Sequence, residues 1–129
     1  MSTIETPPAF SSGDYNQGNF LFAGDHLTGI IDFALPRFED PHIGMAMYWI
    51  YCWDPFDRAG IVERYLERQR LSFADFAPRL ALRCLRTLQA NLPVRGGEEV
   101  RGEWDFESLA ENRRRVLGLL ERAMAAMTS

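Results

Sequence analysis

The chain has 129 residues, of which 47% are hydrophobic and 25% are charged, as in ordinary soluble globular proteins. This length suits one domain with a hydrophobic core, so we expect a single domain over residues 1–129. The formal net charge of −4 argues against a nucleic-acid or an anionic-membrane partner. All 14 basic residues are arginine, so the chain contains no lysine.

The two cysteines, Cys52 and Cys84, make neither a disulfide framework nor a metal-ligand cluster. The N-terminal stretch MSTIETPPAF lacks the basic segment and apolar run of a signal peptide. No run of apolar residues is long enough for a transmembrane helix. We therefore expect a cytoplasmic protein without a membrane partner.

The first elements in the chain are expected to be extended. Residues 1–10 contain two adjacent prolines and predict an extended leader. Residues 19–23 and 26–32 are short runs rich in aromatic or β-branched residues, and Gly24-Asp25 between them suits a tight turn with a positive φ. The pattern predicts a two-stranded hairpin over 19–32, which must pack on something because an isolated hairpin is marginal in water.

A loop with Pro36 and Asp40-Pro41 separates the hairpin from a helical region, 42–129. The helices are expected at residues 44–53 and 57–71, within a segment that begins at Ser72 and runs to about Asn91, and at residues 105–127, with a polar loop at 93–102. The first is apolar almost all round, which predicts burial on most sides. In the third, Pro78 suits the first turn, and the expected core face consists of Leu80, Leu82, Leu85 and Leu88. The fold class is therefore α+β, a short hairpin followed by about four helices.

The hairpin has polar residues at its open end, which admit two interpretations. Asp14, Asn19 and Asp32 are residue types that often serve as turn residues, and each alone is explained in that way. Alternatively they form a site, because a hairpin returns the chain so that Asp32 meets Asn19. Carboxylate and amide oxygens are ligands that Mg²⁺ accepts.

The run SGDYNQGNFLF…LTGIIDF…EDP resembles the aminoglycoside phosphotransferase and choline kinase group of protein-kinase-like enzymes. The resemblance is strong over residues 11–41. It is carried by Gly13, Asp14 and Asn19, which match the catalytic loop, by Asp32-Phe33, which match the metal-binding segment, and by Asp40-Pro41. It implies a fold like the C-terminal lobe of such an enzyme.

The resemblance also implies a reaction and its residues. Asp14 would orient or deprotonate an acceptor hydroxyl, while Asn19 and Asp32 would hold Mg²⁺ and, through it, ATP. The acceptor would be a small molecule, such as an aminoglycoside or an amino alcohol. Four acidic residues admit two interpretations, as groups that attract a cationic acceptor or as solvated loop residues: Glu39, Asp40, Asp54 and Asp57.

The chain departs from the family pattern in ways that bear on activity. Ser12 stands where these enzymes usually have a histidine, and Gly44 stands where an aspartate usually braces the catalytic loop. The motif begins at Gly13, which leaves no room upstream for a nucleotide-covering lobe, and no lysine can pair with the ATP phosphates.

We therefore expect a partner polypeptide lobe, or a homo-oligomer, to cover apolar surface near the hairpin and the 44–53 helix. The alternative is a non-catalytic, pseudokinase-like interaction module.

Overall fold

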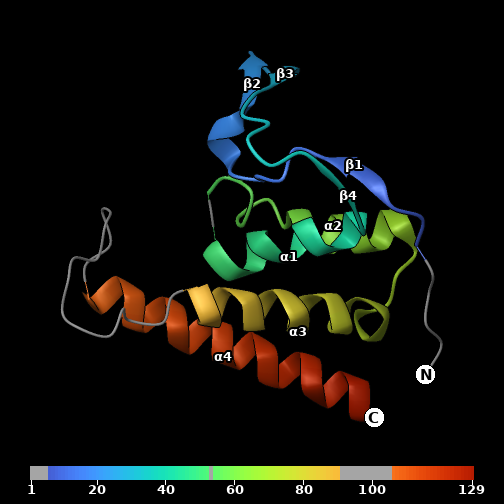
Figure 1. Cartoon of the computed structure of the whole chain (residues 1–129), viewed down its shortest axis with the longest axis vertical. Coiled ribbons are helices and arrows are strands. Elements are labelled where there is room, and N and C mark those ends of the chain that lie inside the picture. Colours follow the sequence, from blue (N-terminus) through green and yellow to red (C-terminus); the bar gives the residue numbers. More distant parts are fainter. Residues whose placement is uncertain (1–5, 53, 91–105) are drawn as a thin grey trace. The chain divides into compact units, whose positions relative to one another are not determined.

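The computed structural model describes residues 6–52, 54–90 and 106–129 (Figure 1). Within these ranges it has two short antiparallel strand pairs and four α-helices, which confirms the predicted α+β class. The chain divides into two compact units, residues 1–62 and 63–129, and the single domain expected over 1–129 stays a prediction. No helix in the described ranges is long and apolar enough to cross a bilayer.

The predicted hairpin is present in the first unit. Strand β2 (Phe20–Ala23) pairs antiparallel with β3 (His26–Ile30), and a short 3-10 helix, η1 (Gln17–Asn19), leads into β2. Ala23 pairs with His26 across the turn, where Gly24 has a φ of 63° as its residue type predicts. The expected strand at 26–32 is shorter in the structure, because the ladder ends at Ile30.

A second strand pair was not predicted. Strand β1 (Ala9–Ser11) pairs antiparallel with β4 (Arg37–Glu39), with Phe10 opposite Phe38 and Ser11 opposite Arg37. These residues were expected to lie in an extended leader and a loop. Three residues are too few to show an alternating pattern, so the pairing left no signal in the sequence. Its consequence is that residues before and after the hairpin are tied together.

Helix α1 (Pro41–Tyr51) starts three residues before the predicted 44. Asp40 is its N-cap, because its side chain accepts a hydrogen bond of 2.8 Å from the His42 backbone N–H, and Pro41 occupies the first turn. Burial on most sides is confirmed. The buried α1 residues are His42, Gly44, Ala46, Met47, Tyr48 and Ile50. No large hydrophobic residue of α1 (Pro41–Tyr51) is exposed, so α1 itself contributes little to the apolar surface expected near the hairpin and this helix.

The second unit contains most of α2 (Ile61–Gln69) together with α3 (Phe73–Ala90) and α4 (Phe106–Thr128). Helices α3 and α4 lie side by side (Figure 1), and the Arg122 guanidinium lies 5.2 Å from the Phe73 ring centroid. Ser72 and Asp75 exchange hydrogen bonds at the start of α3, as in a capping box.

Two expectations for α3 are wrong. Pro78 lies inside the helix and not in its first turn, because the helix begins earlier, at Phe73. Leu82 and Leu85 were expected in the core but are 39% and 54% exposed. The buried face is formed instead by Phe76, Ala77, Leu80, Ala81, Cys84 and Thr87. The polar loop expected at 93–102 lies outside the described residues.

Candidate functional site

Asp14 lies in the loop between β1 and η1, where hydrogen bonds within the loop hold it. Its Oδ1 accepts from the Asn16 backbone N–H at 3.0 Å, and its backbone carbonyl accepts from Ser12 Oγ at 3.0 Å. Burial, together with the nearby Tyr15 and Asp14, raises the pKa of Tyr48 on α1 to about 12. The Asp14 carboxylate is therefore within electrostatic reach of α1, and it is half-buried.

Asn19 is the last residue of η1 and directly precedes β2. Its backbone carbonyl accepts a hydrogen bond of 2.9 Å from Ile31 N–H, one residue before Asp32. Its side-chain Nδ2 is buried and has no hydrogen-bond partner among the described residues. A buried amide without a partner is costly and is uncommon in folded proteins unless something else contacts it.

Asp32 follows β3 and has a φ of 62°, in the left-handed region that non-glycine residues rarely adopt. Its Oδ1 accepts a hydrogen bond of 3.3 Å from the Ala34 backbone N–H, and the residue is exposed. Backbone conformations of this kind gather at functional sites, where the surrounding structure maintains them.

Aromatic rings fix the base of the hairpin to α1. Phe20, the residue after Asn19, contacts Phe56 edge-to-face with ring centroids 6.0 Å apart. Phe56 in turn contacts Tyr48 of α1 at 5.3 Å, again edge-to-face. The position of Asn19 is therefore set by packing of its neighbour as well as by its own backbone hydrogen bond.

The structure places Asn19 and Asp32 at the same end of the hairpin, as the spacing predicted, and it places Asp14 in the loop that leads into Asn19. The described residues contain no group of three or more His, Cys, Asp or Glu side chains that could hold a metal ion. A metal at this end would therefore rely on one carboxylate and one amide, a small set of hard oxygen ligands of the kind Mg²⁺ uses while keeping several waters.

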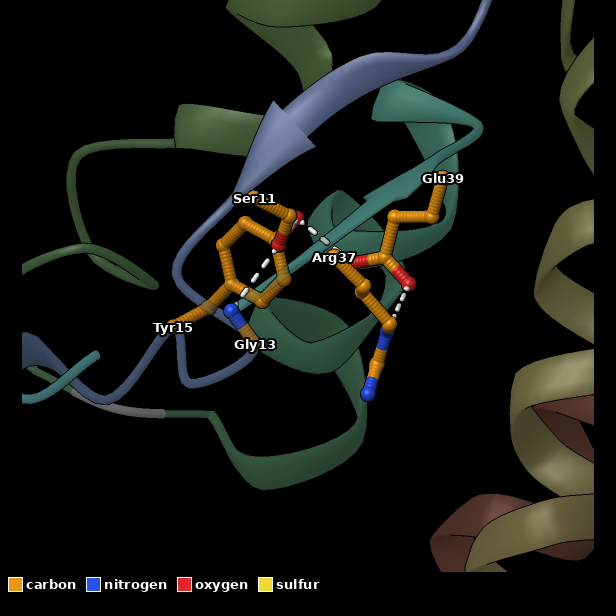
Figure 2. Close-up of polar contacts among 5 residues, drawn as sticks. All are labelled: Ser11, Gly13, Tyr15, Arg37 and Glu39. Carbon is orange, nitrogen blue, oxygen red and sulfur yellow. Dashed lines mark hydrogen bonds and ion pairs between the residues drawn. The ribbon is translucent and has the colours of Figure 1, made fainter. Parts of the chain in front are cut away.

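Sequence reasoning missed the residues that hold the Asp14 loop (Figure 2). Tyr15 Oη donates to Glu39 Oε1 at 3.0 Å and lies 2.6 Å from Ser11 Oγ, while Arg37 Nε lies 2.7 Å from Glu39 Oε2. Gly13 N–H donates to Ser11 Oγ at 3.0 Å. Ser11 of β1 meets Arg37 and Glu39 of β4 only because these two strands pair, so the network could be predicted only if the β1–β4 pairing had been predicted first.

Three of the four acidic residues considered for a cationic acceptor have partners in the chain. Glu39 binds Arg37 and Tyr15, Asp40 caps α1, and Asp54 lies 2.6 Å from Arg58. These contacts favour the interpretation as structural residues. Asp57 is exposed, and its backbone carbonyl accepts from Gly60 N–H.

A loop carboxylate followed by a hairpin, with an amide and a second carboxylate at the hairpin's open end, is the arrangement expected of a kinase-like phosphotransferase. Residues 4–82, more than half of the chain, match the model of the phosphotransferase enzyme family. The chain belongs to this family. No curated protein and no solved structure matches it significantly.

Proposed function

We propose that this chain supplies the acceptor-activating and metal-binding part of a site that transfers the γ-phosphoryl group of ATP to a hydroxyl of a small molecule. The observation that carries the proposal is the hydrogen bond from Ile31 N–H to the Asn19 carbonyl, because it sets Asn19 beside Asp32 at one end of the hairpin. Family membership supports the class of reaction.

Asp14 is the proposed catalytic residue. One of its oxygens, Oδ1, accepts from Asn16 N–H, which fixes the plane of the carboxylate. Its other oxygen is left to accept a hydrogen bond from the acceptor hydroxyl. A carboxylate in this position orients the hydroxyl and takes its proton as the new bond to phosphorus forms.

Asn19 and Asp32 are the proposed Mg²⁺ ligands. The fit of the residues to the metal rests on their hard oxygen atoms, the side-chain Oδ1 of Asn19 and the carboxylate of Asp32, the latter in a residue held at a positive φ. Magnesium bound there with ATP would neutralise charge that develops on the phosphate oxygens. The acceptor class, such as an aminoglycoside or an amino alcohol, follows from the family resemblance.

Calorimetric titration of the chain with ATP, with and without Mg²⁺, tests the metal site. We expect magnesium-dependent binding that Asp32→Ala abolishes. Asp25→Ala is the matched control, because Asp25 is an exposed acid in the turn at the other end of the same hairpin. Broadening of the Asn19 and Asp32 amide signals by Mn²⁺-ATP extends the test to weak binding. If millimolar Mn²⁺-ATP leaves both signals unchanged, the proposed metal site is wrong for this chain.

We further propose that a second polypeptide lobe covers the apolar hairpin surface, defined as Leu21, Phe22, Leu27, Ile30 and Ile31. Each of these side chains is between 44% and 55% exposed, and adjacent exposed apolar residues usually mark an interaction site. The lobe would also supply the cation for the ATP phosphates, since this chain has no lysine.

Light scattering at several protein concentrations, together with binding of an apolar dye, tests the apolar hairpin surface. A dye-binding monomer supports a separate lobe, and a mass that doubles with concentration supports a second copy of the chain instead. Phe22→Ser should reduce dye binding, whereas Leu85→Ser, at an equally exposed leucine of α3, should not. A monomer that does not bind the dye contradicts the proposal.

The same exposed surface favours a second candidate function, a non-catalytic interaction module. Asp32→Ala separates the two candidates, because a docking module keeps its partner when the metal ligand is removed. Loss of nucleotide binding and turnover in that variant, with the partner still bound, supports the catalytic function.

A further inference from the structure

We infer that Tyr15, seated in a notch that Gly44 leaves on α1, is a positioning residue that anchors the loop carrying Asp14. The anchoring is independent of any reaction. Its catalytic consequence rests on the proposed function, because Asp14 is the group that would activate the acceptor hydroxyl.

The notch exists because Gly44 has no side chain. A Cβ added at this buried position would lie 2.6 Å from both Cε1 and Cε2 of the Tyr15 ring, and closer still to its Cζ. Carbon atoms in favourable contact are about 3.5–4.0 Å apart. The phenol ring therefore occupies the space where any other residue at 44 would place its side chain.

The hydroxyl of Tyr15 is fixed by a directed chain of hydrogen bonds (Figure 2). It donates its single proton to Glu39 Oε1 at 3.0 Å, so the 2.6 Å contact with Ser11 Oγ is donated by the serine. Ser11 Oγ in turn accepts from Gly13 N–H at 3.0 Å. Each donor in this series of hydrogen bonds has one acceptor, so all the bonds are donated in the same direction, from Gly13 toward Glu39.

Arg37 maintains the negative charge of Glu39, the last acceptor in this series of hydrogen bonds. Burial acts to raise the pKa of Glu39, but the combined influence of Arg37, Ser11 and Tyr15 outweighs it and lowers that pKa. Burial raises the pKa of Tyr15. Glu39 thus remains an acceptor and Tyr15 a donor throughout the neutral pH range.

The anchor bears on Asp14 because it holds both neighbours of that residue. Gly13 on one side is hydrogen-bonded to Ser11, and Tyr15 on the other side is inserted at Gly44. The backbone of Asp14 cannot move without breaking one of these contacts. Ser12 and Gly44 stand where the family resemblance leads one to expect a histidine and a bracing aspartate. In this chain a phenol from the loop itself takes the place of that brace.

The test compares Tyr15→Phe, which keeps the ring and removes the hydroxyl, with Gly44→Ala, which fills the notch. Gly118→Ala is the matched control for the latter, because a Cβ at Gly118 of α4 meets no atom within 4 Å. The readout is the amide NMR signal of Asn16, whose proton shift reports the Asp14 carboxylate because Asn16 N–H donates to it. Amide exchange rates at residues 13–16 are measured on the same samples.

Both loop variants should move the Asn16 amide proton signal, because they weaken the hydrogen bond from Asn16 N–H to the Asp14 carboxylate. We also expect amide exchange at residues 13–16 to become about tenfold faster while α3 keeps its protection. Gly118→Ala should change neither. The double variant Tyr15→Leu with Gly44→Ala should lose less free energy of unfolding than the sum of the losses in the two single variants, because the smaller side chain relieves the clash with the new Cβ. If Tyr15→Phe and Gly44→Ala both leave the Asn16 signal and these rates unchanged, the inference is overturned.

These measurements stand apart from the proposed function, since failure of Mn²⁺-ATP to affect the hairpin leaves the Asn16 readout intact. Where phosphoryl transfer is measurable, Tyr15→Phe should lower kcat several-fold with the KM for ATP unchanged, because the proposed metal ligands are held by the hairpin and not by Tyr15. An equal effect on both constants, or an effect on KM alone, contradicts the positioning role.

Discussion

Replacing Gly13 with alanine tests the local geometry of the Asp14 loop most sharply. Gly13 has a φ of 83°, and a Cβ there would collide with the backbone carbonyl oxygen of Leu35 and lie 3.0 Å from the Leu35 Cβ. A left-handed conformation costs an alanine about 1–2 kcal/mol. Overpacking against a backbone atom adds about 1–3 kcal/mol, because the backbone of Leu35 must move.

We therefore expect Gly13→Ala to lower the free energy of unfolding by about 2–5 kcal/mol. Two further glycines separate the contributions. Gly24 also has a positive φ, 63°, but a Cβ there meets no atom within 4 Å, so Gly24→Ala should cost only about 1 kcal/mol. Gly118 is helical with open space around it, and alanine there should stabilise α4 by about 0.5–1 kcal/mol.

Urea unfolding followed by circular dichroism measures the three variants against the unaltered chain. From the most to the least stable, the expected order is Gly118→Ala, the unaltered chain, Gly24→Ala and Gly13→Ala. The reasoning is refuted if Gly13→Ala costs no more than Gly24→Ala, because the two positions share the backbone penalty and differ in the contact with Leu35.

Three other predictions concern the helices and the thiols. Asp40→Ala should lower the free energy of unfolding by about 1 kcal/mol, measured by urea unfolding, because it removes the N-cap of α1; an unchanged midpoint would contradict the cap. The side-chain hydrogen bond from Ser72 lowers the pKa of Asp75 below 3.8, so its stabilising contribution is present above that pH and is lost on acidification. The difference in the free energy of unfolding between the unaltered chain and Asp75→Asn should therefore become smaller as the pH is lowered. A difference that becomes larger on acidification would contradict the lowered pKa of Asp75. Burial raises the pKa of Cys84 to about 11, so a thiol reagent should modify the half-buried Cys52 first under native conditions, which peptide mapping would establish or disprove.

The fold could be predicted from the sequence where the signal is local. Gly24 with apolar runs on either side specifies the hairpin, and the nearly all-apolar sequence around Met47 specifies a buried helix. The error in α3 has a physical cause, since counting leucines favoured Leu82 and Leu85. The helix instead buries smaller side chains such as Ala77 and Cys84, whose weak hydropathy hides the face they share.

The candidate site divides in the same way. The placement of Asn19 near Asp32 follows from the hairpin register, so motif spacing was sufficient to anticipate it. The anchor of the Asp14 loop could not be anticipated, because Tyr15 and Gly44 belong to different elements. A glycine whose role is to have no side chain also leaves no chemical pattern in a sequence.

The contact between Tyr15 and Gly44 changes how the missing aspartate at position 44 should be interpreted. Gly44 appeared from the sequence to be a deficiency, the absence of a carboxylate beside the catalytic loop. In the structure its lack of a side chain admits the Tyr15 ring, and the ring's hydroxyl reaches a carboxylate at Glu39 that β4 provides. The loop is thus supported through β1, β4 and α1 together. The departures at Ser12 and Gly44 are therefore not in themselves evidence against the proposed function, which the magnesium-dependent ATP titration tests directly.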